Sequence, residues 1–132
     1  VFGACGGCNV QHLVPAAQLA WKRERVSREL SDAGLTTFGP VADVVPSPRP
    51  YGYRNQAKFV WGRVDGRLVL GSYRPRSHEL VDMTACRIVE PAIAALLAPL
   101  RDALEQAGLE PYDERDARGE LRYVLLRANQ AG

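Results

Sequence analysis

The sequence predicts an α+β fold, in which helices pack on a small antiparallel sheet that follows an N-terminal cysteine loop. Residues 54–61 and 67–73 are two strand-like runs on either side of the pair Asp65-Gly66. That pair favours a tight β-hairpin, because both of its residues accept positive φ angles. A helical pattern lies on each side of the hairpin, and two cysteines stand within the first eight residues. Together these features give an α+β pattern without internal repeats.

The segment before the hairpin contains the first predicted helix. We expect it over 15–33, because Pro15 suits a first helical position and Gly34 follows the last turn. The four prolines within 39–53 leave room for one short edge strand, at 41–45, and then an extended connection. The apolar face of the helix is formed by Leu19, Val26, Leu30 and Ala33.

The first run of the hairpin alternates between two faces. Ala57, Phe59 and Trp61 share one face, which we assign to the core, and Lys58 lies on the other, more open side. We also expect Trp21 to be a core residue rather than a platform for stacking.

The segment after the hairpin predicts further elements. Residues 80–83 form a short strand that leads to the third cysteine, and 121–128 form a last strand after the acidic loop 110–120. Between them, 91–108 is strongly apolar at helical spacing, and Pro99 is expected to split it into two short helices.

Length and composition indicate one globular domain over residues 1–132. The chain is 46% hydrophobic and 24% charged, and it begins with Val, which indicates a fragment of a longer protein. No apolar run approaches the roughly 20 residues of a membrane-spanning helix, and no signal-peptide pattern opens the chain. We therefore expect a cytoplasmic protein with no membrane partner.

The charge is unevenly distributed along the chain. Residues 1–87 hold 12 basic against 7 acidic side chains, whereas 88–132 hold 5 against 8. Of the 17 basic residues 15 are Arg, the side chain suited to phosphate contacts and to stacking on bases. A genome rich in G and C would also enrich Arg, so the Arg excess is weak evidence for a nucleic-acid partner.

The three cysteines suggest a metal or redox site. Cys5 and Cys8 are separated by two glycines, which can bend tightly enough to aim both sulfurs at one metal, and Cys86 follows far downstream. Iron–sulfur clusters and structural zinc sites normally take four ligands, so one ligand is missing. The residues alone leave three alternatives open: reduced thiols, a zinc site completed by His12, and a free-standing zinc or redox module without an RNA partner.

Several motifs, in their order along the chain, carry a resemblance to a known family. They are Phe2-Gly3-Ala4-Cys5-Gly6-Gly7-Cys8, Gln11-His12-Leu13, Gln18-Leu19 with Lys22, Tyr53-Arg54-Asn55-Gln56-Ala57, Gly71-Ser72-Tyr73-Arg74 with Ser77-His78, Cys86, and Leu121-Arg122-Tyr123-Val124-Leu125. In these motifs the sequence closely resembles the amino-terminal and central part of the iron–sulfur-containing, S-adenosylmethionine-dependent RNA uracil-5-methyltransferases. Members of that family make 5-methyluridine in bacterial 23S ribosomal RNA.

The resemblance implies a four-iron four-sulfur (4Fe-4S) cluster. Cys5, Cys8 and Cys86 match its second, third and fourth ligands, and the first would fall just before Val1. In the family, S-adenosylmethionine and the catalytic residues belong to a carboxyl-terminal domain that has no counterpart in this chain. We therefore assign no catalytic residue here and do not expect the fragment alone to catalyse methylation.

The resemblance implies that the partner of the chain is RNA, specifically 23S ribosomal RNA. RNA recognition usually targets unpaired bases, through stacking, edge hydrogen bonds and phosphate contacts. Arg54, Lys58 and Arg74 are the first choices, because long cations reach phosphates readily. The candidate RNA-binding residues are Gln11, His12, Lys22, Arg54, Asn55, Lys58, Arg74, Arg76 and His78. Each has a structural alternative, such as a cap on a strand or a brace for the cysteine loop.

Overall fold

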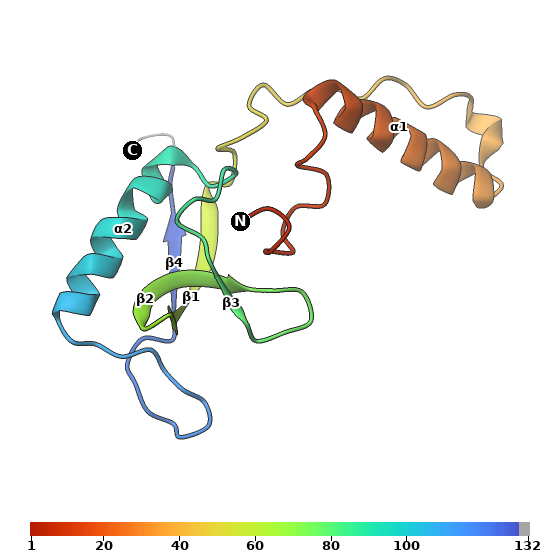
Figure 1. Cartoon of the computed structure of the whole chain (residues 1–132). Helices are drawn as coiled ribbons and strands as arrows, with labels where there is room; N and C mark the ends of the chain where they lie inside the picture. Colours follow the sequence, from red (N-terminus) through yellow and green to blue (C-terminus); the bar gives the residue numbers. More distant parts are fainter. Residues whose placement is uncertain (130–132) are drawn as a thin grey trace. The chain divides into compact units, whose positions relative to one another are not determined.

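The computed structural model describes residues 1–129, with the backbone alone at Phe38, and it confirms the predicted α+β class (Figure 1). The chain divides into two compact units. One, called here the helix unit, comprises residues 9–50. The other, called the sheet unit, comprises residues 1–8 and the chain from residue 51 onward. No helix in the described part is both long and apolar enough to cross a membrane.

The helix unit is built on α1 (Pro15–Asp32), which confirms the first predicted helix and is followed by the short helix η1 (Thr36–Phe38). Pro15 opens α1, where its missing N–H costs no hydrogen bond. The prediction that Trp21 is buried is wrong: 39% of its surface is exposed, and α1 contributes no buried residue. The Arg25 guanidinium lies 5.6 Å from the centre of the Trp21 ring, so a cation one turn away shares the surface with it.

The predicted edge strand at 41–45 is absent from the structure. Arg23 on α1 donates a hydrogen bond to the Val41 carbonyl at 3.0 Å and forms an ion pair with Asp43 at 2.8 Å. The segment therefore bonds to a helix side chain instead of to a neighbouring strand. Pro46, Pro48 and Pro50, which follow this segment, lack the N–H donors that pairing with a neighbouring strand requires.

The sheet unit contains four antiparallel strands in the order β3-β2-β1-β4. The strands are β1 (Gln56–Val64), β2 (Arg67–Tyr73), β3 (Leu80–Asp82) and β4 (Tyr123–Arg127). The predicted hairpin is confirmed, because Asp65 and Gly66 have φ angles of 50° and 79° and join β1 to β2. Both late strands are also confirmed, and β4 returns from the far end of the chain to pair with β1.

One face of the sheet forms the core under α2 (Pro91–Gln106), which lies alongside the strands in Figure 1. As predicted, Ala57, Phe59 and Trp61 point into this core, and they are 8%, 2% and 5% exposed. Each large side chain buried in this way stabilises the fold by about 1.5–3 kcal/mol. The remaining apolar members of the cluster are Leu68, Leu70, Met83, Val89, Ile93 and Leu97.

α2 is one continuous helix, so the predicted division at Pro99 is wrong. Pro99 removes one hydrogen bond from the helix interior. Packing compensates for that loss on both sides of the proline: Ile93 and Leu97 are buried before it, and Leu100 and Leu104 pack against the same core after it. Pro99 itself is exposed, on the side of α2 where water can bond the freed carbonyl.

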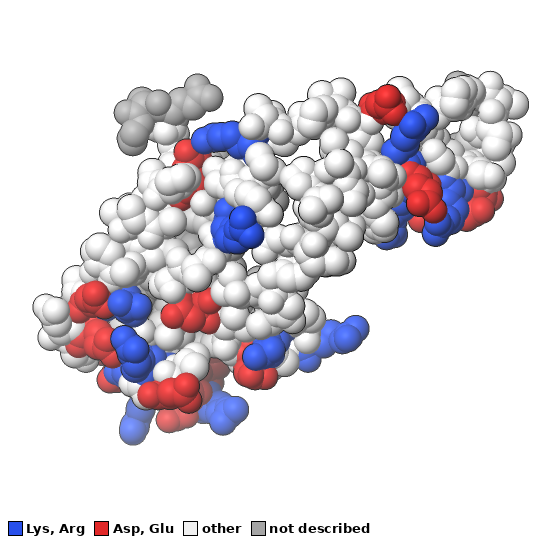
Figure 2. All heavy atoms as spheres, turned by 45° about the horizontal axis from the view of Figure 1, so that its top comes forward, with Lys and Arg blue, Asp and Glu red and all other residues white. Residues whose placement is uncertain are grey.

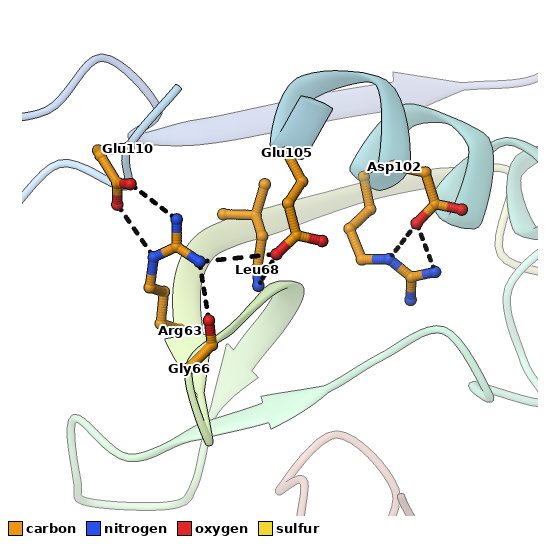
Figure 3. A network of polar contacts seen from close by, with 7 residues as sticks. Arg63, Gly66, Leu68, Asp102, Glu105 and Glu110 are labelled. Carbon is orange, nitrogen blue, oxygen red and sulfur yellow. Dashed lines mark hydrogen bonds and ion pairs between the residues drawn. The ribbon is translucent and has the colours of Figure 1, made fainter. Parts of the chain in front are cut away.

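A network of polar contacts fixes the hairpin turn to the end of α2 (Figure 3). Arg63 donates two hydrogen bonds to the Glu110 carboxylate, at 3.0 and 2.7 Å, and one to the Gly66 carbonyl at 2.9 Å. Glu105 lies 3.6 Å from the same guanidinium and accepts the N–H of Leu68 at 3.1 Å. The hydrogen bonds from Arg63 hold the pKa of Glu110 below its ordinary value, and Glu110 in turn raises the pKa of Arg63.

Candidate functional site

The three cysteines all belong to the sheet unit and are free thiols. Cys5 and Cys8 lie in the N-terminal loop, where the Cys5 N–H donates to the Val1 carbonyl at 2.9 Å and the Cys5 Sγ accepts the N–H of Gly7 at 3.4 Å. Cys86 lies in the turn after β3, and its N–H donates to the Met83 carbonyl at 3.0 Å. All three are half-buried, and Cys5 and Cys86 pack against the same hydrophobic core.

The cysteine loop rests on the connection between β2 and β3. A Cβ atom added at Gly6 would stand 2.6 Å from Cγ of Pro75, which is closer than non-bonded carbon atoms approach in a folded protein. At Gly7 the nearest atom would be the Cys5 sulfur, at an ordinary 3.4 Å. Neither glycine has a positive φ angle. Residues 6 and 7 do form a turn, as the sequence suggested, but their φ angles are ones that other residues also adopt. The contact with Pro75 is therefore what requires glycine at position 6.

The environment of Cys8 couples it to the other two thiols. Burial raises the pKa of the Cys8 thiol, and the charges of Cys86 and Cys5 raise it further, while Arg54 acts in the opposite direction. Three soft sulfur donors are the chemistry that zinc and iron–sulfur clusters take. Within residues 1–129, however, no group of three or more Cys, His, Asp or Glu side chains converges closely enough to hold a metal ion. The donor chemistry thus fits a metal or cluster, whereas the present side-chain arrangement is not a ligand set.

Three predicted RNA-binding residues lie in the helix unit. Gln11 is half-buried and His12 is exposed in the turn before α1, and Lys22 is exposed on α1 itself. Other cations of this helix are paired with carboxylates: Arg28 with Glu24 at 2.6 Å and Arg25 with Glu29 at 3.8 Å.

The other six predicted RNA-binding residues lie in the sheet unit and are all exposed. Arg54 and Asn55 precede β1, and the Arg54 backbone bonds to Ile88 and Glu90, just after Cys86. Lys58 projects from the middle of β1. Arg74, Arg76 and His78 lie in the β2–β3 connection, on either side of the proline that contacts the cysteine loop. The structure thus brings two of the predicted groups, the thiols and these basic side chains, into neighbouring loops.

One of these cations is already neutralised in part. Arg74 forms an ion pair with Glu79 at 2.9 Å, across the β2–β3 connection. In the face drawn in Figure 2, Lys and Arg side chains are interspersed with Asp and Glu and do not form one basic surface. The face drawn in Figure 2 therefore carries no single basic patch that would by itself indicate an RNA-binding surface.

Sequence reasoning missed the exposed side chains on the second face of the sheet. This face, which we call the open face, is turned away from α2 and carries Lys58 of β1 and Tyr123, Leu125 and Arg127 of β4. Tyr123 and Leu125 are 55% and 54% exposed, whereas their neighbours on β4, Val124 and Leu126, pack against the core. The alternation of side chains along the last strand was visible in the sequence, but which set of alternate residues faces the core depends on the pairing with β1.

Curated relatives match nearly the whole chain. A protein of Listeria innocua named as an uncharacterized RNA methyltransferase is 35% identical over 127 residues, which is 96% of this chain and 28% of the relative. Proteins with the same description from Halalkalibacterium halodurans and Gloeobacter violaceus are 35% and 36% identical over the same shares of the two chains. The chain therefore spans little more than a quarter of the length of these relatives. No protein-family model matches it.

A solved structure shares the fold. The tRNA (uracil-54, C5)-methyltransferase of Pyrococcus abyssi, in complex with S-adenosyl-L-homocysteine, matches 96% of this chain and 29% of its own. The TM-score is 0.71 and the sequence identity is 26%. The sequence relatives and this structure are all named as methyltransferases of RNA, and in each of them the match covers 28% or 29% of the protein. Over nearly its whole length, this chain is therefore related to one segment of the RNA methyltransferases.

Proposed function

We propose that this chain is the RNA-binding segment of a longer, S-adenosylmethionine-dependent methyltransferase that acts on C5 of uridine in 23S ribosomal RNA in the cytoplasm. The observation that carries the proposal is the match of 96% of the chain to proteins named as RNA methyltransferases. The structural neighbour is named as a uracil-C5 enzyme and holds S-adenosyl-L-homocysteine, which is the methyl donor after loss of its methyl group. The methyl donor and the catalytic groups belong, in this proposal, to other parts of the longer protein.

We further propose that Cys5, Cys8 and Cys86 are ligands of a 4Fe-4S cluster. Support comes from the soft donor set, from the packing of Cys5 and Cys86 on one core, and from the coupling of Cys8 to both other thiols. A cluster there would tie the N-terminal loop to the turn after β3, two segments that are far apart in the sequence. Its role would be to stabilise this arrangement, because metal binding energy adds to folding energy.

The RNA contacts proposed for this segment are the nine residues predicted from the sequence. Six of them are exposed in the sheet unit, and three of those flank the proline that supports the cysteine loop. The cluster would thus hold the loop beside Arg74, Arg76 and His78.

The experiment that tests the activity uses the longer protein with radiolabelled S-adenosylmethionine. Unmodified 23S ribosomal RNA and unmodified transfer RNA serve as parallel substrates, and the labelled nucleoside is identified by mass spectrometry. We expect 5-methyluridine in ribosomal RNA alone. Label in transfer RNA alone would overturn the ribosomal part of the proposal and favour the substrate in the neighbour's name. Label in neither RNA would overturn the proposed activity.

The experiment that tests the cluster is iron and acid-labile sulfide analysis of the longer protein purified without oxygen. We expect iron and sulfide in similar amounts, and their loss in the variant Cys86→Ser. The variant His12→Ala is the matched control, because His12 is a metal ligand in the zinc alternative and not in the proposed cluster. Zinc without sulfide, lost on His12→Ala, would contradict the cluster and support a zinc module.

A further inference from the structure

We propose that the open face of the sheet is a binding site for single-stranded RNA, in which the Tyr123 ring stacks on a base and Lys58 and Arg127 contact phosphates. The proposal rests on the RNA-binding function proposed above and places it on a surface of β1 and β4. Among these residues only Lys58 was predicted from the sequence.

The strand register places the aromatic ring and the cation side by side. Val60 pairs with Tyr123 and Lys58 pairs with Leu125, so these four side chains share one face of the sheet. The Lys58 Nζ lies over the Tyr123 ring, 4.0 Å from its centre, along the diagonal between the two strands. A base that stacks on this face takes the place of the ammonium group, and the long Lys58 side chain can then turn to the phosphate of that nucleotide.

The exposure of Tyr123 and Leu125 distinguishes them from the other apolar residues of the sheet. More than half of the surface of each residue is exposed, although both stand on a strand whose alternate residues pack against the core. A flat, exposed ring on a rigid strand is the platform on which proteins stack unpaired bases, because every base offers a π face. Leu125 extends the apolar surface on the same strand.

The charge of the open face complements a nucleic acid. By register it carries Lys58, Arg67 and Arg127, and within residues 1–129 none of them is paired with a carboxylate. Asp82 is the one carboxylate that the four strands place on this face. It lies on β3, at the opposite edge from β4, and its Oδ1 accepts the Thr84 N–H at 2.8 Å.

These features favour RNA over a protein partner. Burying cations under a protein surface without carboxylates would cost solvation energy, whereas phosphates pair with them. The open face also continues toward the β2–β3 connection that carries Arg74, Arg76 and His78, because Tyr73 at the end of β2 shares this face and its ring lies 5.6 Å from that of His78. A strand of RNA can therefore use both surfaces.

The test measures fluorescence anisotropy of a labelled uridine dodecamer with the longer protein, at one fixed salt concentration. We expect Tyr123→Ala to weaken binding about fivefold or more, the lower limit for one stacked base. Tyr123→Phe keeps the ring and should bind within about twofold of the unsubstituted protein. Leu96→Ala is the matched control, because Leu96 is a 53% exposed apolar residue on α2, which covers the other face. It should leave binding unchanged.

A second measurement covers the case in which a variant unfolds. A dodecamer that contains 5-iodouridine is photocrosslinked to the unsubstituted protein, and the attached peptide is identified by mass spectrometry. We expect the crosslink on β4, at Tyr123. Unchanged affinity of Tyr123→Ala, or a crosslink that lies only outside β1 and β4, would overturn the stacking proposal. The methylation assay distinguishes this failure from failure of the proposed function. If the protein methylates RNA but Tyr123→Ala binds RNA normally, the stacking site is wrong and the proposed function stands.

Discussion

At the scale of single residues, Gly6 determines whether the cysteine loop can rest on the sheet unit. Its hydrogen atom faces Pro75, and a methyl group in its place would stand 2.6 Å from a ring carbon. Because a proline ring has little freedom to move aside, the loop or the β2–β3 connection would have to shift. That shift would also displace Cys5 and Cys8 from Cys86.

We therefore predict that Gly6→Ala lowers the free energy of unfolding by about 1–3 kcal/mol, the usual cost of overpacking. The control is Gly7→Ala, whose new methyl group would meet the Cys5 sulfur at an ordinary 3.4 Å. Urea unfolding of the two variants measures the difference. Equal stability of both variants would show that the loop does not rest on Pro75.

At the scale of elements, α2 shows how packing overrides local propensity. The helix continues through Pro99 because apolar residues on both sides of the proline pack against one core. The hydrogen bond that Pro99 removes still costs free energy, so proline remains an unfavourable residue at this position of α2.

We predict that Pro99→Ala raises the free energy of unfolding by about 1–3 kcal/mol, because it restores an N–H donor and removes the clash of the ring with the preceding turn. Pro91→Ala is the control, since Pro91 is the first residue of α2, where no intrahelical bond is lost. Thermal unfolding is the measurement. A lower melting temperature for Pro99→Ala would mean that the ring makes a stabilising contact.

The network between the hairpin and α2 predicts a dependence of stability on pH. The Arg63 hydrogen bonds lower the pKa of Glu110 in the folded chain. A carboxyl with a lowered folded pKa stabilises the fold above its unfolded pKa, and this contribution is lost as the pH falls through the folded value. We expect Glu110→Gln to be less stable than the unsubstituted chain near neutral pH and equally stable in acid, below that pKa. Urea titrations across this range give the comparison, and a difference that does not change with pH would contradict the assignment.

The elements that the sequence predicted correctly are those defined by local chemistry. Asp65 and Gly66 specify the hairpin by their own backbone preferences, and Pro15 marks the start of α1. The strand at 41–45 was predicted wrongly because the Arg23 side chain, distant in sequence, takes the place of a strand partner. The open face could not be predicted either, because the pairing of β4 with β1 joins residues more than sixty positions apart.

At the scale of the candidate site, the sequence predicted thiol ligands and basic RNA contacts, and both stay predictions, whereas the environment of these side chains comes from the structure. Cys5, Cys8 and Cys86 lie in one unit, and burial together with the other two thiols raises the pKa of Cys8, yet within residues 1–129 the three do not form a ligand set. Tyr123 was missed because an aromatic residue in a strand pattern is as consistent with the core as with the surface. Only the register decides between them.

At the scale of the whole molecule, ion pairing changes the meaning of the charge. The net charge of +2 conceals an excess of Arg, but many of these side chains form ion pairs, such as Arg23 with Asp43 and Arg122 with Glu114. On the open face, cations such as Lys58 and Arg127 have no ion-pair partner within the described residues 1–129, so they are the better candidates for contacts with phosphates. The RNA recognition that we propose for this chain is therefore expected to depend on a few positions and not on overall charge.

The central claim is that the chain belongs to a protein that methylates uridine C5 in ribosomal RNA. The most direct measurement is the 5-methyluridine content of purified 23S ribosomal RNA and transfer RNA, by mass spectrometry, from cells with and without the gene. We predict that deletion removes 5-methyluridine from ribosomal RNA, leaves transfer RNA unchanged, and is reversed when the intact gene is restored. Unchanged 5-methyluridine in both RNAs after deletion would contradict the claim.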